Sequence, residues 1–417
     1  MQNKAFKTYL LFLVTYALRN TQRNLRRSLL IVATVAFAVS IVNIASGYSK
    51  SIVKLWQSWA SDTGSAHSQI HKTGYWAKQE GVDIDLTLGE NNLIEDSLAR
   101  DKDVAHFARR LKVEGMITTD TDSLFFKGIG VNPDSELKVS PKLFTNNDRG
   151  RFLTQANRSE VVIGPGLASG LGLDVGSEAT LIAQTARGSV NAVDVVVVGI
   201  VDMGLPGFSK RSLFANVEHF QRLLRIGPRY SEIAVKLKND ESIDDWVRLK
   251  SPWMKSKGVE LMGWWRVEPM IKAVEDIWDS VILIITALLF FSASMSILNM
   301  ISMMVNERTI EIGTLGAIGA RDIDIYLLLS FEAGFLGLLG SITGTALGYL
   351  AVAAMNISGM PFDSPFGGSL IVHPHFSLKL AVITFVVGIT ITMLASILPA
   401  LKATRVEPTV AFRNQLN

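Results

Sequence analysis

The sequence predicts an α-helical membrane protein with four transmembrane helices, arranged one plus three, and a large mixed α/β extracytoplasmic domain between the first and second helices. Of its 417 residues, 48% are hydrophobic and only 19% are charged, and the mean hydropathy is +0.28. A soluble protein of this length rarely has so positive a hydropathy. Four apolar stretches are long enough to cross a bilayer, which takes about 20 helical residues, and one long polar segment separates the first from the other three.

The first apolar stretch, residues 28–47, follows a long basic segment. Its end resembles a signal-peptide cleavage site, but the lead-in is too long and the apolar core exceeds the usual ~7–15 residues. We therefore expect a retained span. Residues 1–27 contain a shorter apolar run with tyrosines and basic neighbours, which favours an amphipathic helix at the inner membrane interface. A frayed cytoplasmic helix is the alternative.

Three further spans follow from the same criterion, and lysine and arginine orient all four. The expected spans are residues 277–305, 325–355 and 378–401. Basic residues precede the first span and occur in the 306–324 turn and the 402–417 tail, whereas the 356–377 turn has none. Because basic residues favour the cytoplasmic side, both termini and the 306–324 turn are predicted to be cytoplasmic. The 356–377 turn and residues 48–276 are then predicted to be extracytoplasmic.

The polar segment 48–276 is long enough for one or two compact domains. Both of its ends continue the helical period of the neighbouring spans, so we expect stiff helices that could transmit displacement, with ordinary helix extensions as the alternative. Between these ends the pattern is mixed. The expected strands are 123–133, the start and end of 160–184 with a short helix between them, 193–202 and 230–238, and the expected helices are 217–226 and 242–258, the last interrupted near Pro252.

No catalytic, cofactor or metal site is expected in this chain. It has no cysteine, which excludes disulfides, thiolate metal sites and cysteine nucleophiles. The glycines of residues 160–177 suit tight turns better than a phosphate loop, because the chain has no Walker A pattern. His67 and His71 have the spacing of a helical metal pair, but no third ligand accompanies them, and we expect a solvated face. The basic residues form no polar stripe, which argues against nucleic-acid binding.

The segment between the second and third spans, VNERTIEIGTLGAIGA at 305–320, is short, charged and rich in glycine. The polar residues that can share one helical face are Asn306, Glu307, Arg308 and Glu311. The small residues that keep the helix thin are Gly313, Gly316, Ala317, Gly319 and Ala320. Each glycine costs about 1 kcal/mol of helix stability relative to alanine, so close approach by another surface must matter more. We interpret the segment as a joint that another protein grips, with an ordinary re-entry turn as the alternative.

The third span carries glycines at a regular spacing. The predicted packing residues are Gly337, Gly340, Gly344 and Gly348. Small residues four apart let helices approach closely in lipid, so we expect a tight contact with another span or with a partner subunit. Glu332 lies near the inner edge of this span. We expect its carboxylate to snorkel to the interface, with a buried functional carboxylate as the alternative.

Several motifs together resemble the MacB/FtsX-type ABC transporter permease family, which also contains the lipoprotein-releasing LolC and LolE subunits. The motifs are ALRNTQRNLRRSLL (17–30), EVVIGPGLASGLGLDVGS (160–177), NERTIEIGTLGAIGA (306–320) and LPALKATRVEPTVAFR (398–413). The 306–320 motif is similar to the family's coupling helix. It departs from the common pattern at Ile310 and Gly316, where many members have a basic residue, so the ATPase surface it meets is expected to differ.

The resemblance implies a permease in the bacterial inner (plasma) membrane that binds a separate cytosolic ABC ATPase through the 306–320 segment. The chain would not itself be an enzyme and would bind no cofactor, since ATP and Mg belong to the partner ATPase. Motion would pass into the extracytoplasmic domain and move a lipoprotein, a lipid or another periplasmic cargo toward the outer membrane or outside. The further expected partners are a second permease copy or a paralogue, membrane lipid, and a periplasmic adaptor or lipoprotein chaperone.

An FtsX-like transmembrane regulator, which activates a cell-wall hydrolase without transport, is the alternative function. It ranks second because the outer domain of that branch is usually smaller than residues 48–276. A membrane-anchored enzyme ranks third, because no catalytic set of residues is visible in the sequence.

Overall fold

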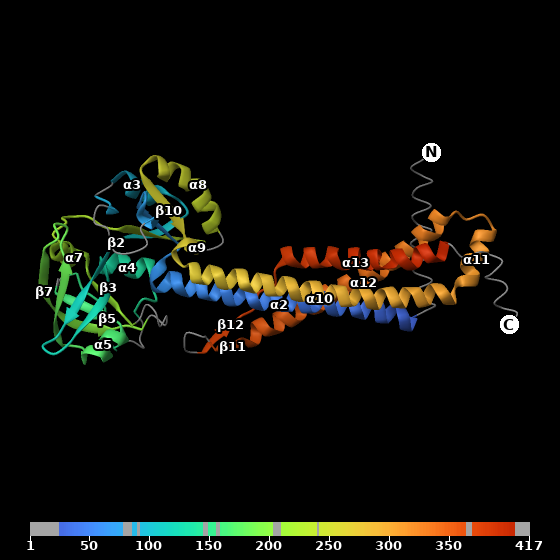
Figure 1. The fold of residues 1–417 in the computed structure, drawn as a ribbon, viewed down its shortest axis with the longest axis horizontal. Helices are drawn as coiled ribbons and strands as arrows, with labels where there is room; N and C mark the ends of the chain where they lie inside the picture. Colours follow the sequence, from blue (N-terminus) through green and yellow to red (C-terminus); the bar gives the residue numbers. More distant parts are fainter. Residues whose placement is uncertain are drawn as a thin grey trace. The chain divides into compact units, whose positions relative to one another are not determined.

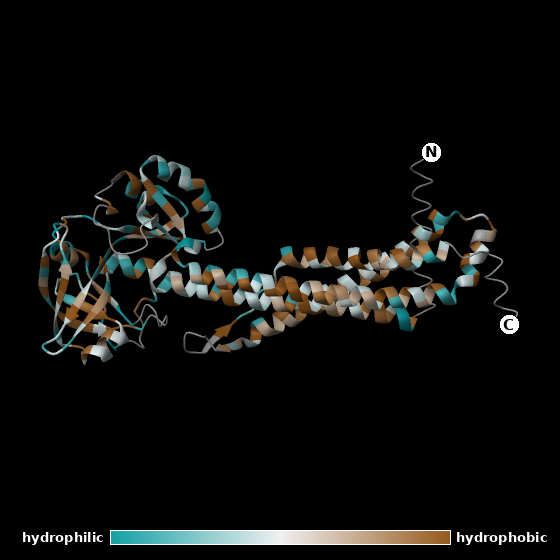
Figure 2. Cartoon of the chain, viewed as in Figure 1, coloured by the Kyte–Doolittle hydropathy of each residue, from teal (hydrophilic) through white to brown (hydrophobic). Residues whose placement is uncertain are grey.

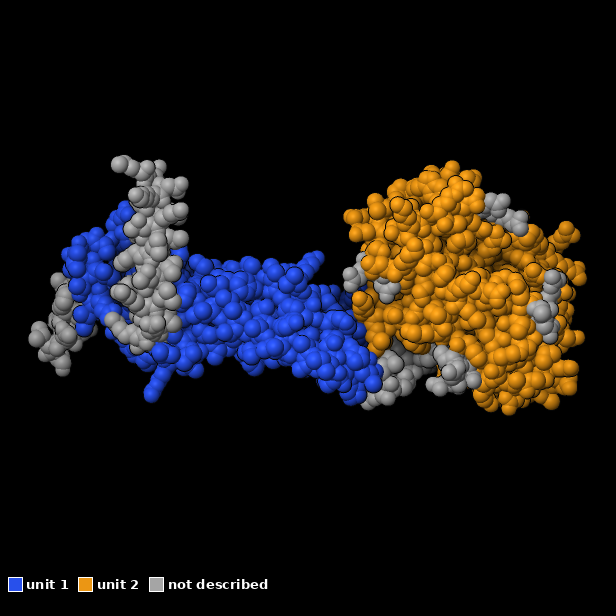
Figure 3. Space-filling view, turned by 180° about the vertical axis from the view of Figure 1, so that it is seen from behind, with its two compact units in different colours: residues 1–53, 275–362, 371–417 blue, residues 54–274, 363–370 orange. Residues whose placement is uncertain are grey.

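The computed structural model forms two compact units, which Figure 3 colours separately. The described residues are 25–77, 86–89, 92–144, 149–155, 159–202, 210–239, 242–363 and 369–404. Unit 1 comprises residues 1–53, 275–362 and 371–417, and unit 2 comprises residues 54–274 and 363–370. The interfacial helix expected within residues 1–27 and most of the 402–417 tail lie outside the described residues.

Four long helices build unit 1 (Figure 1). They are α2 (Leu25–Ala60), α10 (Pro269–Glu307), α12 (Asp322–Ser358) and α13 (Leu378–Thr404). Each holds an 18-residue window with a mean hydropathy of 1.8 to 2.5 and is long and apolar enough to cross a membrane. Figure 2 shows long hydrophobic stretches in these helices. The prediction of four apolar helices, one before and three after the polar segment, is confirmed.

The helices of unit 1 are longer than the predicted spans. α2 continues to Ala60 and α10 already begins at Pro269, so the expected helical continuation at both ends of the polar segment is confirmed. The boundary between the two units falls inside both helices. A short helix, α11 (Thr309–Ala317), lies between α10 and α12. The segment expected as a plain turn at 356–377 contains two paired strands, β11 (Met360–Asp363) and β12 (Ser369–Val372).

Unit 2 contains a ten-stranded mixed sheet in the order β10-β1-β9-β2-β3-β8-β5-β7-β4, with β6 paired to β2 and β7. The strands are β1 (Ser68–Lys72), β2 (Val104–Thr118), β3 (Ser123–Val131), β4 (Arg149–Gly150), β5 (Glu160–Ile163), β6 (Glu178–Gln184), β7 (Val190–Ile200), β8 (Ser212–Asn216), β9 (Glu232–Leu237) and β10 (Val259–Gly263). Among these strand pairs, β3–β8 and β5–β7 are parallel, and the others are antiparallel. The expected strands at 123–133, in 160–184, at 193–202 and at 230–238 are confirmed.

Short helices connect these strands. They are η1 (Ser61–Ser65), η2 (Tyr75–Ala77), α3 (Asn92–Arg100), α4 (Pro133–Val139), α5 (Pro165–Leu171), α7 (Val217–Leu224), α8 (Ile243–Ser256) and α9 (Trp264–Val267). The expected interruption of α8 at Pro252 is wrong, because the helix continues through it. A proline removes one backbone donor, but Trp246 and Met254, on either side of it, are buried in the domain core and stabilise both turns.

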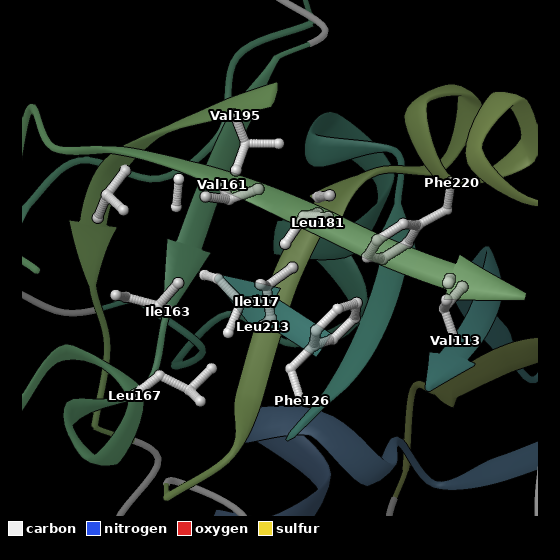
Figure 4. Close-up of a cluster of buried hydrophobic side chains, with 14 of the residues drawn as sticks. Val113, Ile117, Phe126, Val161, Ile163, Leu167, Leu181, Val195, Leu213 and Phe220 are labelled. Atoms are coloured by element: carbon white, nitrogen blue, oxygen red, sulfur yellow. The ribbon is translucent and has the colours of Figure 1, made fainter. Parts of the chain in front are cut away.

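Among the described residues of unit 2, a large apolar cluster lies against the β2–β3 and β5–β8 part of the sheet (Figure 4). Phe126 of β3 and Phe220 of α7 stack with ring centroids 6.1 Å apart. A Cβ at Gly128 would lie 2.7 Å from the Phe220 ring, closer than packed atoms approach. The glycine therefore lets α7 pack directly on the sheet.

Candidate functional site

The candidate site is the break between α10 and α11. α10 ends at Glu307, and α11 begins at Thr309. Between them, the Arg308 amide donates to the carbonyls of Met304 (3.2 Å) and Val305 (3.1 Å). The residues predicted to share one helical face are divided by this break: Asn306 and Glu307 end α10, Arg308 lies in the turn, and Glu311 lies in α11. That prediction of a single face is wrong, because the helix does not continue through Arg308.

Arg308 points into the unit, where it is only 6% exposed. Its Nη1 lies 3.1 Å from Oε2 of Glu332 on α12, and its Nε lies 3.2 Å from Oε2 of Glu311. Glu332 is itself only 4% exposed. The expectation that Glu332 snorkels is wrong, because its carboxylate meets Arg308 inside the unit. A buried charge needs such a partner, so this pair fixes the turn onto α12.

A second ion pair joins the same turn to the first helix. Arg27, near the start of α2, donates through both terminal guanidinium nitrogens to the two carboxylate oxygens of Glu307. Both side chains are partly exposed. The pair ties the start of α2 to the end of α10. Sequence reasoning missed Arg27, whose partner is 280 positions away; the available signal was a basic cluster predicted on the same side of the membrane as the turn.

α11 has one buried and one exposed edge. Ile312 packs into the apolar cluster of unit 1, whereas Ile310 is exposed and Ile318, just after the helix, is 81% exposed. Among the predicted small residues, Gly313 is buried, Ala317 and Gly319 are exposed, and Ala320 is half-buried. Gly319 has a φ of +103°, a conformation that glycine adopts without strain. The segment therefore ends abruptly and leaves a thin apolar edge open.

The predicted packing glycines of α12 lie against two neighbouring helices. A Cβ at Gly340 would lie 2.6 Å from Cβ of Val35, and one at Gly344 would lie 2.6 Å from the Ala36 carbonyl oxygen, both on α2. The corresponding distances are 3.0 Å from Gly348 to Cβ of Asn43 on α2 and 2.8 Å from Gly337 to Cβ of Thr392 on α13. Only glycine allows α12 to approach these helices so closely.

The segment that follows α2 is held inside unit 2 by charged groups. The Asp62 carboxylate of η1 lies between Nζ of Lys236 (2.6 Å) and Nζ of Lys142 (2.9 Å). Burial alone would raise the pKa of Asp62, but the two lysines hold it below its usual value. Arg110 of β2 donates to the Gly64 carbonyl oxygen. The end of the first long helix is therefore fixed to the α/β domain.

Arg110 belongs to a larger buried network. It donates to both carboxylate oxygens of Glu136 (3.0 and 2.6 Å) and lies 3.4 Å from Glu232. Nζ of Lys112 lies 2.7 Å from the other oxygen of Glu232. Burial would raise the pKa of Glu232, but Lys112, His71 and Arg110 hold it at about 2. The group contains two guanidinium or ammonium cations and two carboxylates, so its charges balance.

The two histidines with metal-pair spacing are buried and belong to the sheet. His71 lies in β1, and His67 just precedes it. Nδ1 of His67 accepts a bond from the Leu237 amide (3.1 Å), and Nδ1 of His71 lies 3.2 Å from the Ser231 carbonyl oxygen. Burial lowers the pKa of His71 to about 4. The expected solvated face is wrong because β1 lies between two other strands, and the described residues contain no group of three potential metal ligands.

Two family models match the chain. Residues 28–248, more than half of the sequence, match the MacB-like periplasmic core domain, and residues 283–408 match the FtsX-like permease C-terminal model. The chain belongs to the MacB/FtsX family of ABC transporter permeases. The resemblance seen in the four sequence motifs is thereby confirmed.

Individual relatives are distant. The permease is 25% identical over 275 residues to an uncharacterised ABC transporter permease of Methanocaldococcus jannaschii (64% of this chain, 65% of the relative). It is 27% identical over 192 residues to the macrolide export ATP-binding/permease protein MacB of Escherichia coli (45% and 28%). It is 22% identical over 307 residues to the lipoprotein-releasing system transmembrane protein LolC of Xylella fastidiosa (68% and 72%). The match spans less than two thirds of the first two relatives.

Two solved structures have a low structural similarity to this chain. The periplasmic region of MacB from Actinobacillus actinomycetemcomitans is 13% identical, with a TM-score of 0.33, over 51% of this chain and 94% of that one. The extracellular domain of the transporter YknZ is 11% identical, also with a TM-score of 0.33, over 47% and 100%. These scores are too low to support an argument about the site.

Proposed function

We propose that this chain is the permease subunit of a MacB-type ABC transporter in the bacterial inner membrane. In this proposal α11 and both termini lie in the cytosol, and unit 2 lies on the opposite side. A separate cytosolic ABC ATPase, which holds the ATP and Mg, grips α11. Its motion passes through the long helices to the α/β domain and moves a lipoprotein, a lipid or another periplasmic cargo toward the outer membrane or outside.

The observation that carries this proposal is the break at Arg308. The apolar edge with Ile318 is exposed for a partner. The base of the same segment is tied to α12 through Arg308 and Glu332 and to α2 through Glu307 and Arg27. A partner that moves α11 therefore displaces two long helices directly.

In this proposal, α2 carries the motion from α11 toward the α/β domain. α2 contributes residues to both units, and the segment that follows it is held in unit 2 by Asp62 and by the Gly64 carbonyl oxygen. A rigid helix that is anchored at both ends transmits displacement, whereas a flexible linker absorbs it. We propose that α2 acts as such a transmitter.

Transport is favoured over the FtsX-like regulator by the match of residues 28–248 to the MacB-like periplasmic core domain. The regulator remains the alternative function. It would use the same α11 and the same long helices, but its α/β domain would bind a cell-wall hydrolase and no transported species.

The test is co-purification of the full-length chain with its ATPase from detergent-solubilised membranes, followed by an ATPase assay. We expect Ile318→Glu to lose the ATPase, because a carboxylate at an exposed apolar contact opposes docking. Val190→Glu is the matched control, since Val190 is also highly exposed but lies on β7 of unit 2. Retention of the ATPase by Ile318→Glu would refute the docking site. Capture of a hydrolase without cargo-stimulated ATP hydrolysis would favour the regulator.

A further inference from the structure

The residue that directly follows η1, Ala66, has a backbone conformation that is unusual for alanine. Its φ is +58° and its ψ is −177°, at the edge of a region that glycine alone adopts freely. Among the described residues, Arg225 is the other non-glycine residue with a positive φ. Arg225 is exposed and has the common left-handed geometry of a helix C-cap (φ +54°, ψ +44°), whereas Ala66 is fully buried. The strain at Ala66 therefore has no such ordinary explanation.

Hydrogen bonds from unit 2 fix the segment that leads to Ala66. Main-chain carbonyl oxygens of η1 accept bonds from the surrounding domain. The bonds run from the Lys142 amide to Asp62 (2.9 Å), from the Arg110 guanidinium to Gly64 and from the Gln69 side chain to Ser65 (2.9 Å). The Asp62 carboxylate adds its two lysine contacts. A strained conformation persists where its surroundings determine it in this way.

The side chain of Ala66 is held as well. It belongs to a small buried cluster with Ala108, Val139 and Ala234. Ala108 of β2 and Ala234 of β9 are directly paired in the sheet. The sheet therefore holds both the main chain and the methyl group of the strained residue.

η1 is also bonded to the end of α2. Oγ of Ser61 donates to the Ser58 carbonyl oxygen (3.0 Å), and Oγ1 of Thr63 donates to the Trp59 carbonyl oxygen (2.9 Å). α2 ends at Ala60, and η1 begins at the next residue. A displacement of α2 therefore reaches the strained segment directly, with no flexible linker between them.

We propose that residues 61–66, which we call the hinge, have two states. In the closed state, which has the conformation described above, the bonds from unit 2 hold Ala66 in its strained backbone geometry. When α2 is displaced and these bonds break, Ala66 relaxes to an ordinary negative φ, and the gain from this relaxation keeps the hinge open. Because the loss of the bonds and the release of strain occur together, the hinge opens in one step and not gradually.

The proposal rests on the proposed function in one respect, because the displacement of α2 comes from the ATPase at α11. It adds that the α/β domain does not follow α2 continuously. Small displacements leave the hinge closed, and a sufficient displacement opens it. If Ala66 instead only sets the direction in which β1 begins, the hinge stays closed throughout, and its strain has no part in any movement.

The first experiment measures the strain itself in the full-length permease. Ala66→Gly removes the Cβ that makes the positive φ unfavourable, and Ala108→Gly is the matched control. Both variants lose the same methyl group from the same buried cluster, and both gain the same freedom in the unfolded chain. We expect the thermal midpoint of Ala66→Gly to lie above that of Ala108→Gly, by about 2–4 °C. Equal midpoints, or a lower midpoint for Ala66→Gly, would overturn the proposal.

The second experiment asks whether this strain drives opening. Asp62→Asn weakens both lysine contacts, and amide hydrogen exchange at residues 61–66 should become about 10-fold faster, the factor that corresponds to the release of one strained residue. When Ala66→Gly is added, the exchange should return toward the natural rate, since no strain remains to be released. Asp174→Asn, which removes one charge of an exposed pair with Arg149 in the same unit, should not change this exchange. Unchanged exchange in Asp62→Asn, or equal exchange in the single and double variants, would overturn the proposal.

The two proposals can fail separately. With the ATPase bound and held by a non-hydrolysable ATP analogue, exchange at residues 61–66 should become faster in the natural permease and stay slow in Ala66→Gly. If the ATPase co-purifies and depends on Ile318, but the analogue leaves this exchange unchanged or speeds it equally in both proteins, only the hinge is wrong. If the glycine and asparagine variants behave as expected and no ATPase binds, only the proposed function is wrong.

Discussion

Two buried ion networks, one in each unit, hold the ends of the long helices, and they are built differently. In unit 1, among the described residues, the turn after α10 is held by a buried pair, Arg308 and Glu332. In unit 2 Arg110 contacts two buried carboxylates, Glu136 and Glu232, and Lys112 supplies a second cation. The comparison teaches that one substitution can change the turn at Arg308 in unit 1. A substitution in the network of unit 2 instead disturbs the core of the α/β domain.

We expect the largest loss of stability when the network of unit 2 is altered. Arg110→Ala leaves Glu136 without its bidentate partner and Glu232 with one cation fewer, and removing one member of a buried pair costs about 3–5 kcal/mol. Thermal unfolding of the purified full-length permease should show this loss. Arg248→Ala removes an exposed pair with Asp245 and serves as the control, with an expected change below about 1 kcal/mol. Equal midpoints for the two variants would contradict the comparison.

A smaller loss of stability, but a larger loss of coupling, is expected at Glu332. Glu332→Gln removes the carboxylate that lies 3.1 Å from Arg308 and leaves the contact with Glu311 in place, and we expect a loss of about 1–3 kcal/mol. Cargo-stimulated ATP hydrolysis should fall, although the ATPase still binds, since Ile318 is unchanged. The exchanged pair Arg308→Glu with Glu332→Arg should restore part of the stimulation. Normal cargo-stimulated ATP hydrolysis in Glu332→Gln would show that the Arg308–Glu332 pair does not transmit the motion.

We expect the next loss of stability from a substitution at the contact between α12 and α2. Gly344→Ala introduces a Cβ that would lie 2.6 Å from the Ala36 carbonyl oxygen, and such overpacking typically costs about 1–3 kcal/mol. Ala346→Val adds volume to an exposed position of the same helix and should change the thermal midpoint little. If both variants unfold at the same temperature, the close approach of the two helices is not needed.

The smallest effect concerns acid stability at the Arg151–Glu160 pair of unit 2. Arg151 Nη1 lies 2.8 Å from Glu160, and this contact, with the Thr154 bonds, holds the Glu160 pKa at about 2 although burial opposes it. Because the pKa of Glu160 in the folded protein is below the ordinary 4.5, ionised Glu160 makes its full contribution to stability above pH 4.5. That contribution is lost as the pH falls through about 2. The free energy of unfolding, measured with denaturant, should fall less steeply between pH 7 and pH 3 in Glu160→Gln than in the natural protein. Identical slopes would show that the pair adds no pH dependence.

Much of the fold could be predicted because it depends on local properties. Hydropathy over about 20 residues identifies a span, and the β-branched run at 193–202 identifies β7. The polar segment Ser68–Lys72 was missed as a strand because it is buried on both faces and shows no alternation. For the same reason His67 and His71 were expected in solvent.

The site was only partly predictable. Segment 306–320 was recognised from its charges and glycines, but the position of the break, and with it the burial of Arg308, depends on a contact with Glu332 on another helix. Arg27 and Glu307 are 280 positions apart, so no local pattern relates them. Pairings of this kind follow from packing in three dimensions and are absent from local periodicity.

The most direct test of the central claim is cross-linking at the exposed end of α11. Ile318→Cys, alone in the cysteine-free chain, is treated in native membranes with a short thiol-to-amine cross-linker, beside Val190→Cys on β7. We predict that Ile318→Cys forms a covalent product with the cytosolic ABC ATPase and that Val190→Cys does not. If the ATPase is captured from Val190→Cys, or if Ile318→Cys is labelled by an impermeant maleimide only from the outer face, motion does not enter the permease at α11.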